Sequence, residues 1–333
     1  MARRDRTTGL PRARGRQAAK AQSRFGEREQ RLTMLAGASL LVVFLVGLFG
    51  WRLYDQHVRQ PNKTILAVAG QKYSLRYYSD RIFLAATQQS GSGTNISILQ
   101  QTVLTDLENE GIAIAVAKEK GISVNDEEIT AEIASQLGVP VGGAGSSFDT
   151  LYRQRLSSVK MSDGAYRRYT EAQVYQQKLS KSYQDELGDK SELVTLRTVV
   201  SGSKADADIV LALAQTNADF GSIAQTQSTD LTSRQQDGLM DAEPTRLLPD
   251  AVRTAIGDKT AGAEIFGPVQ VSTNWWVFKI EGRDPNGTFS ETQRSQLGTL
   301  ALQDAVKAKR SQVKIDRNLN SSDYTWANDH AGK

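Results

Sequence analysis

The chain of 333 residues contains no cysteine and only two histidines, His57 and His330, and its formal net charge is +4. The lack of cysteine excludes disulfides, thiolate nucleophiles and cysteine-based metal sites. Two histidines this far apart, one close to an apolar segment and one close to the C-terminus, exclude a Ser-His-Asp triad or a multi-histidine metal centre in the folded core. Phosphate-binding glycine motifs are also missing, so we expect neither a cofactor nor a metal ion.

The first feature along the chain is an uncharged run of 20 residues, Leu32–Trp51. A helix of this length covers the hydrocarbon core of a bilayer, about 30 Å thick. The tail before it, 1–31, carries ten Lys and Arg against three Asp and Glu, and such a bias keeps a tail in the cytoplasm. We therefore expect a single-pass cell-membrane protein in a bacterial-type envelope, with most of the chain extracytoplasmic. The alternative is a cleaved signal peptide, but the run is longer than a signal h-region and lacks an A-x-A-like cleavage site.

The charge outside the tail has the opposite sign. The tail carries a net +7 and the whole chain +4, so the remaining residues carry about −3. This negative balance does not indicate a basic patch on the exported part. The basic tail is better explained by its role in setting the orientation in the membrane and by contact with anionic lipid. We expect no nucleic-acid partner.

After a polar stalk, 54–63, the pattern becomes that of a helical lobe. Thr64–Gly70 is typical of a strand followed by a turn, and Ser74 has the position of a helix N-cap. The segment 125–128 has a capping pattern before an apolar stripe. The Gly-rich stretch 138–147 indicates a break. Apolar residues at helical spacing predict helices starting at 75, 96, 125, 149 and 162.

From Ser191 the pattern changes to short strands and helices. The strands are predicted over Glu192–Val200, Phe266–Val271 and Trp275–Glu281, and a polar loop over Gln227–Arg246. Short helices are predicted over Lys204–Gln215, Ala218–Thr226 and Pro249–Ile256. This order of elements predicts a small α+β domain in which helices cover a sheet. One more amphipathic helix follows over Ser290–Ile315, and the polar residues 318–333 have the composition of a disordered tail.

Residues 192–284 contain an ordered series of short motifs. They are L-R-T-V-V at Leu196–Val200, A-D-F-G-S-I-A at Ala218–Ala224, S-T-D at Ser228–Asp230, D-G-L at Asp237–Leu239, L-L-P-D at Leu247–Asp250, I-F-G-P-V at Ile265–Val269 and W-W-V-F-K-I-E at Trp275–Glu281. The order and spacing of these motifs resemble those of a parvulin-type peptidyl-prolyl isomerase domain. The preceding V-A-G-Q-K-Y-S and K-E-K-G-I-S-V-N-D-E-E-I resemble the N-terminal lobe of SurA/PrsA-type foldases.

The resemblance covers Thr64–Ile315 and implies an α+β fold. Its parts are a mostly helical SurA-N-like lobe, a parvulin-like domain with a small antiparallel sheet flanked by helices, and a C-terminal helix that returns to the lobe. The expected organisation begins with a basic tail (1–31), a transmembrane anchor (32–53) and a stalk (54–63). It continues with the lobe (64–190), the parvulin-like domain (191–284), the returning helix (285–316) and a polar tail (317–333).

The sequence departs from the family where the family's site lies. The two core histidines of the family fall on Arg197 and Trp276, and its pocket phenylalanine falls on Ala251. Arginine cannot replace a neutral imidazole, because it stays charged and only donates hydrogen bonds. Isomerisation about X-Pro breaks no bond and needs an apolar cup with suitable donors, so the loss of histidine weakens the site without forbidding activity.

The resemblance still implies candidate site residues. Asp230 occupies the Cys/Asp position of the family, Thr273 its Ser/Thr position and Leu247 its apolar Met position. The candidate catalytic residues are Asp230 and Thr273, and the candidate substrate-binding residues are Arg197, Leu247, Trp276 and Phe278.

Two local questions stay open at this level. Arg197 and Trp276 either form a cation–π stack, or Arg197 points to solvent while Trp276 joins Phe278 in the core. Asp230 is either a loop-capping aspartate or a catalytic group. Trp275, one residue out of phase with Trp276, is expected on the other face of the sheet.

We weigh three functions. The first is a membrane-tethered chaperone or foldase that binds unfolded or nascent exported polypeptides near the translocation machinery, offers them apolar grooves in its lobe, and has weak or no isomerase turnover. The second is an active peptidyl-prolyl cis-trans isomerase with an atypical site. The third is a non-catalytic docking subunit of an envelope complex.

Overall fold

The structure is a computed structural model that describes residues 46–48, 50–52, 54–88, 95–216 and 219–332. The expected basic tail lies outside these residues, and so does most of the expected anchor, Leu32–Trp51. Among the helices that the structure describes, none combines the length and the apolar character needed to cross a membrane.

The chain divides into two compact units, and the first comprises residues 1–63 and 74–76. Its described part contains a short π-helix, η1 (Asp55–Arg59), in which Arg59 Nη1 lies 3.1 Å from Asp55 Oδ1. Two backbone hydrogen bonds join the separate segments of this unit, from Leu75 N to Lys63 O and from Arg76 N to Pro61 O. The expected stalk therefore contains a helical turn.

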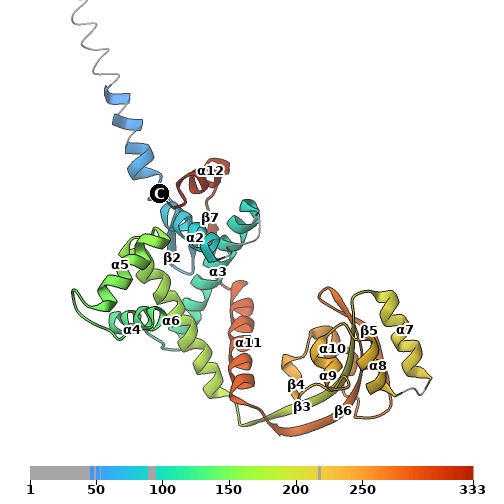
Figure 1. The fold of residues 1–333 in the computed structure, drawn as a ribbon. Helices are drawn as coiled ribbons and strands as arrows, with labels where there is room; N and C mark the ends of the chain where they lie inside the picture. The colour runs from blue at the N-terminus through green and yellow to red at the C-terminus, as the bar shows by residue number, and fades with distance from the viewer. Residues whose placement is uncertain (1–45, 49, 53, 89–94, 217–218, 333) are drawn as a thin grey trace, which may run out of the picture. The chain divides into compact units, whose positions relative to one another are not determined.

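The second unit comprises residues 64–73 and 77–333, and within it we distinguish a helical lobe from a sheet domain. The helical lobe (residues 64–73, 77–189 and 290–332) contains a three-stranded sheet in the order β2-β1-β7. Strand β1 (Thr64–Val68) turns into β2 (Gln71–Ser74) through Ala69 and Gly70, which both have positive φ. Strand β1 also pairs antiparallel with β7 (Ile315–Arg317), so the C-terminal part of the chain closes the lobe (Figure 1).

The helices predicted for the lobe begin within two residues of the predicted starts. Asn125 and Glu128 form the predicted capping box, and Gly121 follows the helix predicted from residue 96, with φ +76. The helices are α2 (Leu75–Gln88), α3 (Ile96–Glu119), α4 (Asp126–Leu137), α5 (Ser147–Val159), α6 (Asp163–Glu186), α11 (Glu291–Arg310) and α12 (Ser321–His330).

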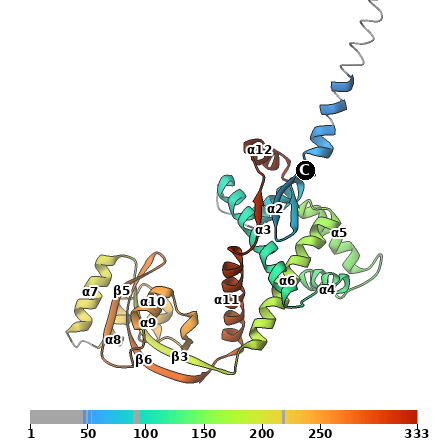
Figure 2. The ribbon, with the colours of Figure 1, turned by 180° about the vertical axis from the view of Figure 1, so that it is seen from behind.

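Helix α11 returns to the lobe, as expected. A glycine at its centre, Gly298, packs so closely on α6 that a Cβ atom there would lie 2.8 Å from the Ser180 carbonyl oxygen. At its C-terminal end, Arg310 Nη1 lies 2.7 Å from Glu108 Oε2 on α3. Both contacts join segments that are more than a hundred residues apart in the chain. Helix α11 therefore packs on the lobe although the residues between α6 and α11 form a separate sheet domain (Figures 1 and 2).

The expectation of a disordered polar tail after residue 317 is wrong. Residues Ser321–His330 form α12, which begins with a capping box between Asn320 and Asp323. Trp326 and Ala327 are buried, and the Ala327 carbonyl accepts a hydrogen bond from Ser79 Oγ at 2.7 Å. A single buried indole and a good N-cap outweigh the polar composition here.

The sheet domain (residues 190–288) contains a four-stranded antiparallel sheet in the order β4-β3-β6-β5. Its elements in chain order are β3 (Lys190–Ser201), α7 (Lys204–Gln215), α8 (Phe220–Gln227), α9 (Leu231–Gln235), β4 (Glu243–Pro244), η2 (Thr245–Leu247), α10 (Asp250–Ile256), β5 (Ile265–Val271) and β6 (Asn274–Thr288). The predicted polar loop Gln227–Arg246 is therefore not irregular throughout, because it contains α9 and β4.

Two apolar clusters hold the sheet domain together, one on each face of the sheet. On one face Leu196, Phe278 and Ile280 pack against α10, and the Phe278 and Phe266 rings stack at 5.5 Å. On the other face Val199 and Val277 pack against α7 and α8. The two clusters follow from the period of two along β3 and β6. The α+β class and the antiparallel sheet flanked by helices are confirmed.

Candidate functional site

The sheet domain has an open cavity of about 520 Å³ at one end of its central strands. We call it the sheet cavity. It is lined by Thr198 and Val200 of β3, Asn274 and Trp276 of β6, Glu243 of β4, and residues of the segment between α8 and β4, namely Thr229, Asp230, Thr232, Ser233, Gln236, Leu239, Met240 and Asp241.

Strand alternation explains which side chains reach the sheet cavity. In the antiparallel register Val200 lies opposite Trp276, and Thr198 lies opposite Phe278. Opposite residues in such a pair share a face, and so do residues two apart along a strand. Thr198, Val200 and Trp276 therefore form a continuous floor, and Trp276 also packs against the apolar cluster beneath α10.

The segment between α8 and β4 is fixed to the edge of β3 by backbone hydrogen bonds. Thr198 N donates to Gly238 O at 2.7 Å, and Met240 N donates to Leu196 O at 2.9 Å. Gly238 has φ +80, and a Cβ atom there would lie 2.7 Å from the Thr198 carbonyl oxygen. Only glycine fits this close approach, which brings Met240 to the cavity wall.

Asp230 is held in the cavity wall by its role as the N-cap of α9. Its Oδ2 accepts from Ser233 N at 2.7 Å, and Ser233 Oγ donates to the Asp230 carbonyl at 3.1 Å. Ser228 Oγ lies 3.0 Å from Ser233 Oγ and accepts from Val200 N at 3.1 Å. This chain of bonds ties the loop to β3, so Asp230 caps a helix and at the same time faces the cavity.

The charged side chains that line the sheet cavity are all acidic, namely Asp230, Asp241 and Glu243. Burial raises the pKa of the Glu243 carboxyl, in spite of a hydrogen bond from Gln293 that lowers it. Carboxylates accept hydrogen bonds and do not donate them. The cavity thus combines an apolar floor with acceptors, hydroxyls and a negative potential.

Arg197 does not reach the sheet cavity. It lies on the opposite face of β3, where its Nε donates to Glu281 Oε1 at 2.5 Å and its Nη1 donates to the Asp237 carbonyl at 2.7 Å. Trp276 is on the cavity face, so the proposed cation–π stack between the two is wrong. The alternative that Arg197 points to solvent is wrong as well, because its side chain is only 21% exposed.

Of the other predicted site residues, some line the sheet cavity and others do not. Trp276 and Asp230 line the sheet cavity, whereas Phe278 is fully buried in the core. Thr273 is in the exposed turn before Asn274, and Leu247 is in η2, where its neighbour Leu248 provides the buried side chain. Trp275 packs against the cluster on the opposite face, so the prediction for that residue is confirmed.

Sequence reasoning missed Thr198, Val200 and Met240 as cavity residues. The sequence does contain a signal for Thr198 and Val200. Because side chains alternate between the faces of a strand, Leu196, Thr198 and Val200 of β3 share one face and Arg197 lies on the other. Met240, by contrast, reaches the cavity through a glycine turn outside any regular strand, and no periodicity marks it.

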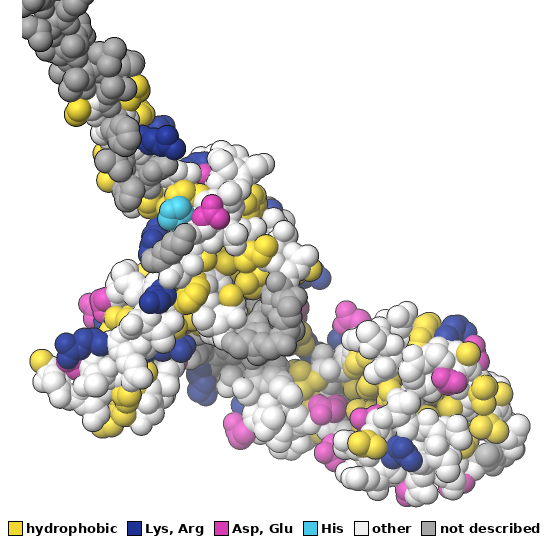
Figure 3. Space-filling model, turned by 45° about the horizontal axis from the view of Figure 1, so that its top comes forward, with side chains coloured by type: hydrophobic (Ala, Val, Ile, Leu, Met, Phe, Trp, Pro, Cys, Tyr) yellow, Lys and Arg dark blue, Asp and Glu magenta, His cyan; other side chains and the backbone are white. Residues whose placement is uncertain are grey.

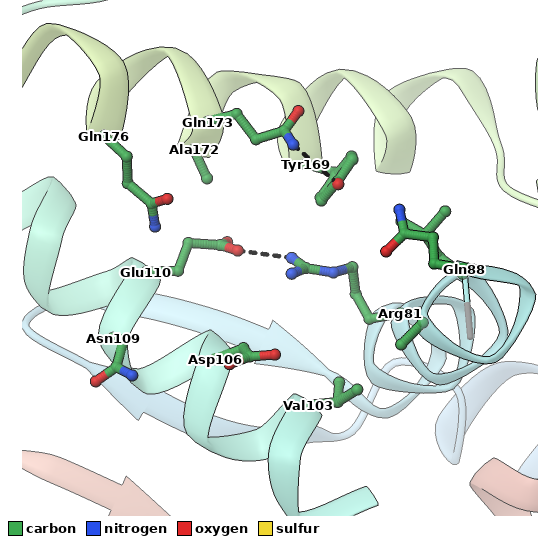
Figure 4. Close-up of a pocket in the computed structure, with 12 residues that line it drawn as sticks. Arg81, Gln88, Val103, Asp106, Asn109, Glu110, Tyr169, Ala172, Gln173 and Gln176 are labelled. Atoms are coloured by element: carbon green, nitrogen blue, oxygen red, sulfur yellow. Dashed lines mark hydrogen bonds and ion pairs between the residues drawn. The ribbon is translucent and has the colours of Figure 1, made fainter. Parts of the chain in front are cut away.

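A second cavity, of about 310 Å³, lies between α2, α3 and α6, and we call it the lobe cavity (Figure 4). Arg81 and Glu110 extend toward one another across it, with Arg81 Nη1 2.6 Å from Glu110 Oε2. The two side chains are only 11% and 5% exposed. The Arg81 guanidinium also stacks on the Tyr169 ring at 4.7 Å from the centroid.

The lining of the lobe cavity is largely polar. Burial raises the pKa of the Glu110 carboxyl, although Arg81 opposes this shift. The remaining polar groups are Gln88, Asp106, Asn109, Gln173 and Gln176, as Figure 4 shows. This cavity therefore does not provide the apolar groove expected in the lobe. Within the described ranges, no group of three or more His, Cys, Asp and Glu side chains is arranged to hold a metal ion.

Comparison with known proteins finds a family model that matches the N-terminal part of the chain. Residues 24–180 match the family described as SurA-like N-terminal domain. A comparison with curated proteins gives no match.

Solved structures similar to this chain include two PrsA proteins and a SurA-like chaperone. The peptidylprolyl isomerase PrsA from Bacillus anthracis is 18% identical, with 62% of this chain and 98% of that chain covered and a TM-score of 0.43. The foldase PrsA from Streptococcus pneumoniae is 15% identical, with 81% and 92% covered and a TM-score of 0.35. A SurA-like chaperone structure from Campylobacter jejuni is 16% identical, with 75% and 94% covered and a TM-score of 0.27. For this part of the chain, the match over residues 24–180 confirms the resemblance to the SurA/PrsA-type foldases.

Proposed function

We propose that this protein is a membrane-anchored extracytoplasmic chaperone or foldase that binds unfolded exported polypeptides and has weak or no prolyl isomerase turnover. The observation that carries the proposal is the sheet cavity, in which apolar side chains (Val200 and Trp276 of the floor and Met240 of the wall) lie beside polar groups that include no histidine. A SurA-like N-terminal domain over residues 24–180 supports the chaperone assignment.

The chemistry of the sheet cavity favours binding over turnover. A proline ring fits against an indole and two aliphatic side chains, because its burial removes apolar surface from water. Catalysis additionally requires interactions that are stronger in the twisted amide than in the planar one. Strong donors suit that role, and the charged groups that line this cavity are carboxylates, which only accept.

The second candidate function is an active isomerase, and the placement of Asp230 favours it. The side chain is fixed at the cavity wall by Ser233 and lies on the same wall as the hydroxyl-bearing Thr229 and Thr232. A positioned carboxylate and hydroxyls could assist rotation of the X-Pro bond. In this version of the function, removal of the Asp230 carboxylate abolishes turnover.

The anchor is part of the proposal. The uncharged run Leu32–Trp51 and the basic tail before it support a single N-in membrane span. An anchor of this kind holds the lobe and the sheet domain on the outer side, where polypeptides leave the translocation machinery. Clients in that position are extended and unfolded, and they expose proline segments.

The test uses the full chain in detergent micelles and measures the exchange rate between cis and trans forms of an X-Pro peptide by NMR. We expect binding of the peptide with little or no acceleration at substoichiometric protein. Trp276→Ala should weaken binding, while the matched variant Trp275→Ala, on the opposite face of the same strand, should not.

Two results would decide against the proposal. Strong acceleration that disappears in Asp230→Ala would make the protein an active isomerase. Absence of any peptide or unfolded-client binding by a folded protein would leave only a docking role.

A further inference from the structure

The sheet cavity has an unbalanced charge. Its lining includes three carboxylates, Asp230, Asp241 and Glu243, and neither lysine nor arginine. Figure 3 shows acidic side chains spread among hydrophobic ones on the visible face of the sheet domain. The acidic side chains alone would not define a site, but here they surround an apolar floor that includes the half-buried indole of Trp276.

The basic residues near the sheet cavity are engaged elsewhere. Arg197 and Lys279 both pair with Glu281 on the opposite face of the sheet. Arg234, which follows directly after cavity residue Ser233, donates from Nε to the Gln225 carbonyl at 3.0 Å. The described side chains of the sheet domain therefore leave the negative potential of the cavity without a neutralising partner inside it.

One of the three carboxylates is especially available. Asp230 Oδ2 is engaged by Ser233 N, and Glu243 Oε2 is engaged by Gln293 at 3.3 Å. Asp241 is exposed between them along the chain, and no hydrogen bond or ion pair to another described side chain is found for it. A cation in the cavity would gain a charge-assisted hydrogen bond from Asp241 without breaking an existing one.

We propose that the sheet cavity selects proline-containing segments in which a lysine or arginine lies next to the proline. This inference rests on the proposed function, because it names the client chemistry of the same site. The proline ring packs on Trp276, Val200 and Met240, and the neighbouring cation lies among the carboxylates. A glutamate or aspartate beside the proline is repelled by the same carboxylates, so the selection acts by attraction and by exclusion.

The experiment compares three peptides that differ only in the residue before proline, namely Lys, Ala and Glu. Each is titrated into the full chain in detergent micelles, and the indole N–H signal of Trp276 is followed by NMR. We expect the Lys peptide to bind about tenfold more tightly than the Ala peptide, and the Glu peptide to bind more weakly still. Raising the salt concentration should narrow the difference, because the cavity is open to solvent.

Two variants locate the source of the selectivity. Asp241→Asn removes one charge from the cavity, and Asp258→Asn removes one charge from an exposed position outside it. We expect Asp241→Asn to reduce the Lys-over-Glu preference severalfold and Asp258→Asn to leave it unchanged. Equal losses in the two variants would overturn the inference, because net charge rather than the cavity would then be responsible.

The outcomes also separate this inference from the proposed function. If the three peptides bind at Trp276 with equal affinity, the function stands and the charge selectivity is wrong. If none of them perturbs Trp276 in a folded protein, the proposed function fails, and the inference fails with it.

Discussion

The helical lobe and the sheet domain place their charges differently. In the lobe, Glu108 is fully buried and binds both Arg310 and Arg317, and Glu110 is almost fully buried against Arg81. In the sheet domain, the comparable cluster of Arg197, Lys279 and Glu281 keeps 21–28% of each side chain exposed. The interior of the sheet domain consists instead of two apolar clusters.

The two regions are stabilised by different kinds of interaction. The buried charges of the lobe connect α3 to α11 and β7, which are about two hundred residues away in the chain, and only correct assembly satisfies them. The sheet domain is almost continuous in sequence, so apolar burial on both faces is sufficient. Its charges remain nearer the surface, and three of them, Asp230, Asp241 and Glu243, give the sheet cavity its potential.

The largest expected effect comes from breaking the charge network of the lobe. Glu108→Ala removes a fully buried carboxylate, but its partners Arg310 and Arg317 are 36% and 52% exposed and stay hydrated. We therefore expect the free energy of unfolding to fall by about 2–4 kcal/mol, from the loss of two hydrogen bonds between charged groups. The matched control is Glu119→Ala on the same helix, because the Glu119 carboxylate is 59% exposed and its pair with Lys309 should contribute less than about 1 kcal/mol. Urea unfolding, with hydrogen exchange of β1 and β7 as the local probe, measures both. Similar losses in the two variants would contradict this assignment of the buried charges.

The next effect concerns the backbone of the sheet domain. Gly238→Ala places a Cβ atom 2.7 Å from Thr198 O and 2.8 Å from Ala224 Cβ at a φ of +80, and we expect a loss of about 1–3 kcal/mol. Gly202→Ala is the control, because a Cβ atom there meets nothing within 4 Å. Thermal unfolding followed at Trp275 and Trp276 reports this region. An unchanged midpoint in Gly238→Ala would show that the turn is not constrained as described.

A pH dependence follows from Glu108. Burial acts to raise its pKa, but hydrogen bonds from Arg317 and Arg310 outweigh burial, and the net pKa is lower than the ordinary value. A carboxylate with a lowered folded pKa contributes stability that is present above its unfolded pKa, about 4.3, and is lost as the pH falls through the folded pKa. The difference in unfolding free energy between the wild type and Glu108→Gln should therefore shrink as the pH falls below about 4. A difference that grows in acid would be inconsistent with a lowered pKa.

The smallest effect is expected for Arg197→Ala. The Arg197–Glu281 pair is partly exposed, so its loss should cost only about 1 kcal/mol of stability. Because Arg197 is on the face opposite the sheet cavity, X-Pro peptide affinity should not change. Calorimetric titration of the variant with the peptide checks this. A loss of affinity as large as that in Trp276→Ala would place Arg197 in the site after all.

The helices and strands could largely be predicted, because local signals determine them. The capping box of Asn125 and Glu128 and the period of two along β3 are such signals. The resemblance places Arg197 at a histidine position of the family, whereas the period of two along β3 puts it on the face opposite Thr198 and Val200. Helix α12 and the strand pairing of β7 depend on contacts with residues far away in the chain, such as Ser79 and Leu66, and composition does not encode those contacts.

The most direct test of the central claim asks whether an unfolded client enters the sheet cavity. A photocrosslinking residue at Asn274, which is exposed and lines the cavity, is compared with the same residue at Asp258 in the full chain. The client is one purified exported protein, offered either unfolded or folded. We expect crosslinks from position 274 to the unfolded client, and few from position 258 or to the folded client. Equal crosslinking from both positions, or none from 274, would contradict the claim.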